Sequence, residues 1–104
     1  MYGYTLHVSD PLEVYLAVHQ AVLDVAAEEG GGDGLVLHLA YPTDRGFDVI
    51  EVWESKEQYD AFNRDVFPKA VARAGLPLEE PALEPVEFSP AGVMVPRAVR
   101  FHTT

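Results

Sequence analysis

Two predicted strands carry the side chains that are best suited to chemistry in this sequence. His38 lies within the apolar run Leu35–Tyr41, where a neutral imidazole can act as a base or as a hydrogen-bond donor toward a cavity. The alternative is a core histidine that bonds to a neighbouring side chain. Glu51, on the next predicted strand, is expected either at a sheet edge in water or buried with a partner, where its pKa would rise.

A second histidine, His7, lies on the first predicted strand. It shares a sheet face with His38 or opposes it, because the sequence does not fix the strand register. If His7, His38 and Glu51 face one side, they offer three ligands for a metal ion, but their spacing matches no recognised ligand motif. We therefore assign His38 to catalysis and His7 and Glu51 to substrate binding, and we expect neither a metal nor a cofactor.

Aromatic residues gather where the third predicted strand passes into a helix. Trp53 ends the strand, and Tyr59 and Phe62 follow on one face of the helix. An aromatic wall with a phenolic donor suits a planar aromatic substrate in a pocket between helix and sheet. We predict that Tyr59 is a catalytic donor and that Trp53 and Phe62 bind substrate; the alternative is that these rings only pack the core.

Composition limits the possible partners. The 104 residues predict a single domain over 1–104, with a core at 4–88 and a C-terminal tail at 89–104. Seven Lys and Arg against 17 Asp and Glu give a formal net charge of -10, which argues against nucleic acid and anionic membrane surfaces as partners. The absence of cysteine excludes disulfides and thiol nucleophiles. We expect a cytoplasmic protein, since neither a membrane-spanning run nor a signal-peptide pattern is present.

Periodicity predicts four strands and two helices. The expected strands are Tyr4–Val8, Leu35–Tyr41, Phe47–Trp53 and Val86–Phe88. The first helix is expected to begin with Asp10 as its N-cap and to end at Gly30–Gly34. The second is expected to begin after an N-cap at Ser55 and to kink or break near Phe67, because Pro68 removes a backbone donor.

The order strand, helix, strand, strand, helix, strand predicts a ferredoxin-like βαββαβ fold. In that fold an antiparallel sheet carries two helices on one face. The second strand is nevertheless apolar on both faces, so its uncovered face is expected to pack against another copy of the chain. The sequence therefore predicts a homodimer formed through the sheet face, with the tail able to reach across to the partner.

Several short segments carry a resemblance to a known family. They are Gly34–His38, Gly46–Phe47, Val52–Ser55, Tyr59 with Phe62, and Phe67–Ala70. On these segments the chain resembles the dimeric α+β barrel superfamily, and within it the antibiotic biosynthesis monooxygenase-like proteins. The resemblance covers roughly Tyr4 to Phe88.

The resemblance implies a cofactor-independent monooxygenase-like activity on an aromatic or polyketide-type small molecule. His38 would be its base or orienting donor, and Tyr59 its pocket donor. Haem degradation is not implied, because Val71 stands near the position of that branch's haem-ligating histidine. The alternative function is a non-catalytic homodimer that binds a small molecule or supports a pathway. The two functions differ in whether a cavity between helix and sheet reaches His38 and Tyr59.

Overall fold

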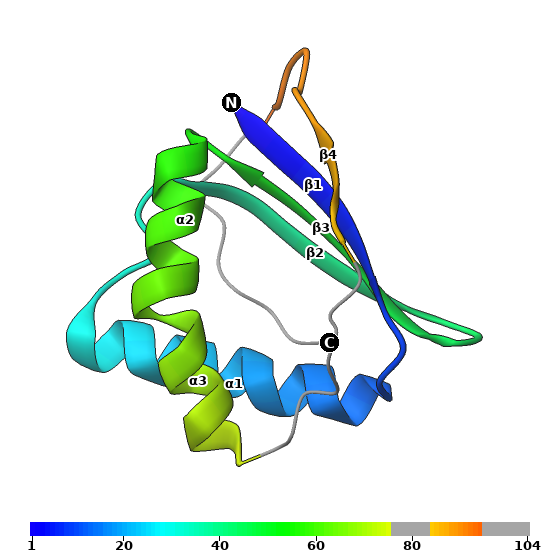
Figure 1. The fold of residues 1–104 in the computed structure, drawn as a ribbon, viewed down its shortest axis with the longest axis vertical. Helices are drawn as coiled ribbons and strands as arrows, with labels where there is room; N and C mark the ends of the chain where they lie inside the picture. Colours follow the sequence, from blue (N-terminus) through cyan, green and yellow to red (C-terminus); the bar gives the residue numbers. More distant parts are fainter. Residues whose placement is uncertain (76–83, 95–104) are drawn as a thin grey trace.

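A computed structural model describes residues 1–75 and 84–94 of the chain (Figure 1). The described elements are β1 (Tyr2–Val8), α1 (Leu12–Glu29), β2 (Leu35–Thr43), β3 (Gly46–Trp53), α2 (Lys56–Asp65), α3 (Phe67–Ala74) and β4 (Val86–Phe88). The predicted α+β class and the four predicted strands are confirmed. Most of the predicted loop before β4, and residues 95–104 of the predicted tail, lie outside the described residues.

The four strands form one antiparallel sheet in the order β2-β3-β1-β4. Figure 1 shows the three described helices on one side of this sheet, with α2 above α1 and α3 lying across α1. The arrangement is compatible with a ferredoxin-like fold.

The second predicted helix is divided into α2 and α3 at Val66. The Ser55 hydroxyl accepts a hydrogen bond from the Gln58 backbone N–H at 3.2 Å, so the predicted N-cap is confirmed. Pro68 lies in the first turn of α3, where a missing backbone N–H costs little. The predicted break near Phe67 is therefore confirmed.

The predicted N-cap of the first helix is wrong. Pro11 occupies the capping position of α1 in an extended conformation, and no side chain caps the helix. Its carbonyl accepts the Val14 N–H at 3.0 Å. Because Pro11 is extended rather than helical, α1 begins one residue later than expected, and Asp10 lies too far from the helix to cap it.

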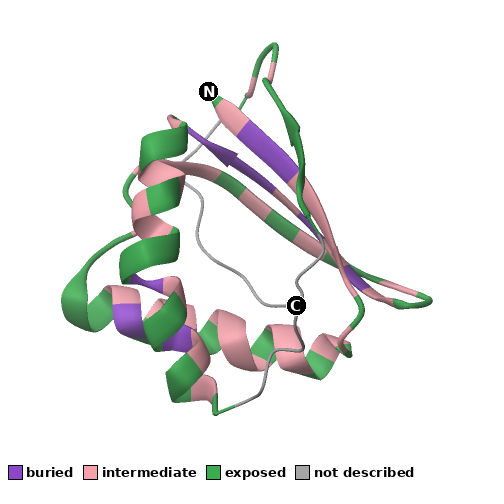
Figure 2. Cartoon of the chain, in the orientation of Figure 1, coloured by how far each residue is buried: buried purple, intermediate pink, exposed green. Residues whose placement is uncertain are grey.

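Two separate apolar clusters hold the layers together. One joins α1 to α3 through Ala21, Val25, Val66 and Ala70. The other joins the sheet to α1 and α2, and its buried members are Tyr4, Phe47 and Val49, to which Leu12, Tyr15 and Tyr59 add helix contacts. In Figure 2 the buried residues accordingly fall on β1 and β3 and on the facing parts of α1 and α3.

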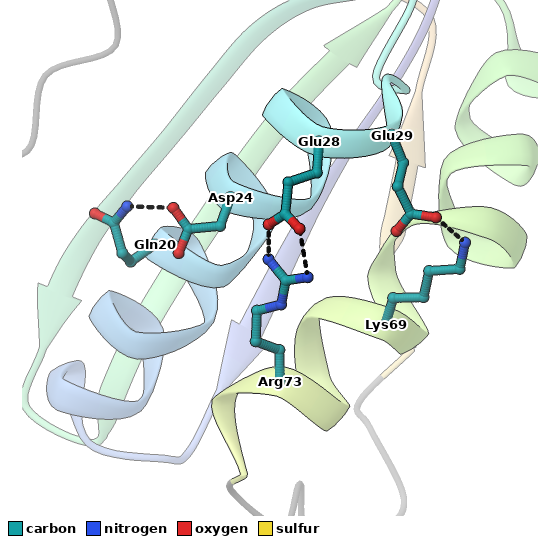
Figure 3. A network of polar contacts seen from close by, with 6 residues as sticks. All are labelled: Gln20, Asp24, Glu28, Glu29, Lys69 and Arg73. Atoms are coloured by element: carbon teal, nitrogen blue, oxygen red, sulfur yellow. Dashed lines mark hydrogen bonds and ion pairs between the residues drawn. The ribbon is translucent and has the colours of Figure 1, made fainter.

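Ion pairs on the surface tie the end of α1 to α3. Figure 3 shows Arg73 and Lys69 reaching from α3 toward Glu28 and Glu29 of α1. The Lys69 Nζ to Glu29 Oε1 distance is 2.8 Å. All four side chains are exposed, so these pairs contribute little beyond the apolar contacts beneath them.

Side chains on the sheet alternate between a helix-covered face and an open face. The open face is defined here by Leu37, Leu39, Tyr41, Val86 and Phe88, all of which are exposed. Leu39 is 48% exposed and Val86 is 68% exposed. Figure 2 shows the resulting alternation of exposed and half-buried residues along β2. The apolar character of both faces of β2 thus corresponds to one covered face and one uncovered face.

Candidate functional site

The register between β2 and β3 brings His38 directly opposite Glu51 on the helix-covered face. His38 Nδ1 lies 2.7 Å from Glu51 Oε2, and the Trp53 indole N–H donates to Glu51 Oε1 at 2.8 Å. Glu51 is only 6% exposed and is a buried charged residue. Of the two environments expected for Glu51, the structure therefore selects burial with partners, and it brings together His38, Glu51 and Trp53.

Helix α1 supplies the other side of this site. The Tyr15 Oη lies 2.7 Å from His38 Nε2 and 3.3 Å from His19 Nδ1. The Tyr15 and His38 rings are nearly parallel, with an interplanar angle of 7°, and their centroids are 5.8 Å apart. A continuous series of polar contacts therefore runs from Trp53 on β3 to His19 on α1.

Donor and acceptor chemistry assigns the proton positions in this series. Both oxygens of the Glu51 carboxylate accept hydrogen bonds, so His38 carries its proton on Nδ1. Nε2 is then an acceptor, and the Tyr15 hydroxyl donates to it. A hydroxyl, an imidazole and a carboxylate are thus aligned in the relation that activates an oxygen acid for proton transfer.

Burial adjusts the acidity of the groups around His38. Burial raises the pKa of Tyr15, and the charge of Glu51 raises it further, so the phenol keeps its proton at neutral pH. Burial lowers the pKa of His19, and the neighbouring His38 adds to that effect. The site therefore favours a neutral His19 and a protonated Tyr15.

The remaining aromatic candidates form a group beside Trp53. The Tyr59 ring lies 6.0 Å from Trp53 and 5.0 Å from Tyr4, and Phe62 lies 5.4 Å from Trp53, measured between ring centroids. Burial raises the pKa of Tyr59 and, more strongly, that of Tyr4. Trp53 itself is fully buried. These rings therefore form part of the core between sheet and helices as well as one side of the site.

His7 lies on the open face, away from His38 and Glu51. Its Nδ1 is 2.6 Å from Asp48 Oδ1, and the Tyr41 hydroxyl donates to Asp48 Oδ2 at 3.0 Å. The hydrogen bond from His7 lowers the pKa of Asp48. The shared face that a metal site of His7, His38 and Glu51 requires is absent, and residues 1–75 and 84–94 contain no group of three His, Cys, Asp or Glu placed to hold a metal ion.

Two surface hollows lined by described residues include neither His38 nor Tyr59 in their linings. One, of about 340 Å³, is on the open face, and its lining includes His7, Tyr41 and Asp48. The other, of about 370 Å³, lies between the glycine-rich turn after α1 and helix α2, beside Gly31, Gln58 and Phe62. Of the predicted substrate-binding residues, His7 and Phe62 therefore line hollows, but different ones.

Tyr15 and His19 are the participants that the sequence analysis did not single out. Both lie on the apolar face of α1, four residues apart, which places them on the same side of the helix. That spacing was visible in the sequence. What it could not indicate is that this side of α1 crosses β2 at His38, because the crossing depends on how the helix sits on the sheet.

Comparison with models of known protein families gives no match, and comparison with curated proteins gives none either. Among the described helices, none combines the length and the apolar character needed to cross a membrane. The case for a function therefore rests on the site geometry and on the resemblance carried by the sequence segments.

Proposed function

We propose that the protein is a cofactor-independent, monooxygenase-like enzyme that acts on an aromatic or polyketide-type small molecule. The observation that carries this proposal is the Glu51–His38 pair. A buried carboxylate fixes the imidazole so that its Nε2 lone pair points toward α1, which is the arrangement of a general base. The ferredoxin-like arrangement and the resemblance to the dimeric α+β barrel superfamily support the same proposal.

The chemistry requires little from the protein. His38 Nε2 takes the hydroxyl proton of a phenol-type substrate, and Glu51 stabilises the imidazolium that forms. The electron-rich phenolate reduces O₂ and forms a carbon–oxygen bond, and the resulting ring hydroperoxide loses water to leave a quinone. One phenol and one O₂ thus give one quinone and one water.

Oxygen uptake with dihydroxynaphthalene-type compounds tests this proposal. We expect the wild-type protein to consume O₂ and to release the quinone. The His38→Gln substitution should lower the rate by about a hundredfold or more, since a positioned base contributes about 10² to 10⁴. Leu16→Gln, on the exposed part of α1, is the matched control and should retain the rate. Oxygen uptake that is absent, or equal in the wild type and His38→Gln, would contradict the proposal.

A second candidate is a non-catalytic homodimer that binds a small molecule or supports a pathway. It is favoured by the open face, where five large apolar side chains are exposed, and by the two described hollows, neither of which is lined by His38. In either function we propose that two copies pair through this face, as in a dimeric α+β barrel. A dimer that binds aromatic compounds without consuming oxygen would favour this second candidate.

A further inference from the structure

We propose that Tyr15 is an internal gate on the His38–Glu51 site, and that a phenolic ligand enters by taking the place of the tyrosine phenol. That the natural ligand is a substrate rests on the proposed function. The displacement of Tyr15 by a phenol does not depend on it. The gate explains why the lone pair of the base accepts a hydrogen bond from Tyr15, and why His38 lines neither of the two hollows described above.

The position next to His38 Nε2 is already filled by the kind of group that a phenolic substrate would present. Tyr15 Oη lies 2.7 Å from Nε2, a normal length for a strong hydrogen bond from a hydroxyl to a bare imidazole nitrogen. Because Glu51 holds the proton on Nδ1, Nε2 can only accept. The site therefore selects a hydroxyl donor and disfavours a carbonyl or an ether.

The surroundings of the Tyr15 ring select an aromatic group. The His19 ring lies 5.3 Å from it at an interplanar angle of 24°, and Phe47 lies 5.3 Å from it in a tilted arrangement, measured between centroids. A planar ring fits between these groups, and a hydroxyl at its end reaches Nε2. A phenol with an alkyl group para to the hydroxyl reproduces both features, because it is the Tyr15 side chain without its backbone.

Tyr15 can leave this position without detaching the helix. Besides Tyr15, helix α1 contacts the sheet cluster through Leu12, and it is anchored to α3 through Ala21 and Val25, which lie one and a half turns or more beyond Tyr15. Tyr15 is itself only half-buried, so a change of side-chain rotamer moves the ring toward solvent. The displaced Tyr15 hydroxyl then forms hydrogen bonds with water, and the hydroxyl of the ligand takes over the hydrogen bond to His38 Nε2.

A closed gate lowers the apparent affinity by the fraction of molecules in which it is open. Removing the gate should therefore strengthen binding. We expect Tyr15→Ala to bind p-cresol at least about tenfold more tightly than the wild type, as measured by isothermal titration calorimetry. Toluene, which has the same ring and no hydroxyl, should bind Tyr15→Ala more weakly than p-cresol does.

Two further variants separate a gate from a simple cavity. Tyr15→Ala combined with His38→Ala should lose the preference for p-cresol over toluene, because the acceptor is gone. Tyr15→Phe should bind p-cresol more tightly than the wild type but less tightly than Tyr15→Ala, because its ring still fills the space but no longer donates to His38 Nε2. Leu16→Ala, one residue along α1 and exposed, is the control for general effects on the helix. The amide spectrum of each variant, recorded by NMR, verifies that the fold is retained.

The gate is overturned if Tyr15→Ala remains folded and binds p-cresol no better than the wild type, or binds toluene equally well. It is overturned also if Tyr15→Ala does not fold, because a gate must be dispensable for the fold. Oxygen uptake is a separate readout. If Tyr15→Ala binds p-cresol tightly but neither the wild type nor any variant consumes oxygen, the gate is supported and the oxygenase is contradicted. If the protein consumes oxygen but Tyr15→Ala does not change the affinity for p-cresol, the oxygenase is supported and the gate is contradicted.

Discussion

At the scale of single residues, the two oxygens of Glu51 control the site. Each accepts from a different donor, the Trp53 indole and the His38 imidazole. An indole N–H can only donate, whereas an imidazole can exchange its donor and acceptor nitrogens. The carboxylate therefore determines which nitrogen of His38 is available to a ligand.

Replacing Glu51 with glutamine should reverse the tautomer of His38. The amide oxygen must turn toward the Trp53 N–H, so the amide NH₂ faces His38 Nδ1 and forces the proton onto Nε2. We expect ¹⁵N NMR of the imidazole to show this change and urea unfolding to show a loss of about 1 to 2 kcal/mol, because a charge-assisted bond is lost. Glu54→Gln makes the same change at an exposed glutamate three positions further along the chain, and it should alter neither the tautomer nor the stability. A proton that stays on Nδ1 would refute the assigned hydrogen-bond directions.

Part of this site could be predicted from the sequence. Strand alternation predicts Glu51 on the same face as Trp53, and His38 stands out as a polar residue within the apolar run Leu35–Tyr41. The face of His7 could not be predicted, because it depends on the register between β1 and β3. The contribution of Tyr15 could not be predicted either, since it depends on where α1 crosses the sheet.

At the scale of elements, the turn into β3 depends on the absence of a side chain at Gly46. Its φ is +141°, outside the range that other residues adopt readily, and a Cβ there would lie 2.0 Å from the backbone carbonyl oxygen of Val8. That oxygen belongs to the end of β1, next to the turn into α1. Close approach of two backbones at this point therefore positions the hairpin against the start of the helix.

Gly46→Ala should lower the free energy of unfolding by at least about 2 kcal/mol, since a strained φ and a backbone clash combine. Gly30→Ala isolates the first cause: its φ is +78°, but a Cβ there meets no atom within 4 Å. Gly92→Ala has neither problem and should be close to neutral. The three values come from urea unfolding monitored by circular dichroism. Equal losses for Gly46→Ala and Gly30→Ala would show that the clash with Val8 is unimportant.

The ends of helices could be predicted where the residues that determine them lie within one turn of the end. The Ser55 cap and the break near Pro68 were predictable, because each arises within one turn of helix. The Asp10 cap was not, because the extended conformation of Pro11 moves the helix start. The α+β class was predictable from the order of the strands and helices, which needs no knowledge of contacts.

At the scale of the whole molecule, the open face and the net charge of -10 act against each other. Exposed apolar side chains favour association, whereas like charges on two copies oppose it at long range. If copies pair through the open face, raised salt should strengthen the dimer by screening this repulsion.

The substitution Leu39→Glu should separate the dimer that we propose. It places a carboxylate in the middle of the open face, where pairing would bury it without a partner. We expect the dissociation constant, measured by analytical ultracentrifugation, to rise at least about a hundredfold. Leu16→Glu adds the same charge on exposed α1 and should have little effect. A wild-type protein that sediments as a monomer at micromolar concentration would remove the basis for the dimer.

The pairing of Gly3 with Phe88 has a consequence for the order of folding. The Phe88 ring fills the space over Gly3, where any Cβ would lie 2.5 Å from the ring. During synthesis β1, β2 and β3 all leave the ribosome before β4, so the edge of β1 stays open until the end. An open edge accepts any extended segment that arrives first. Because Gly3 has no side chain, the Phe88 ring of β4 can pack over it. This contact favours pairing of β1 with β4 over pairing of β1 with other extended segments before β4 is in place.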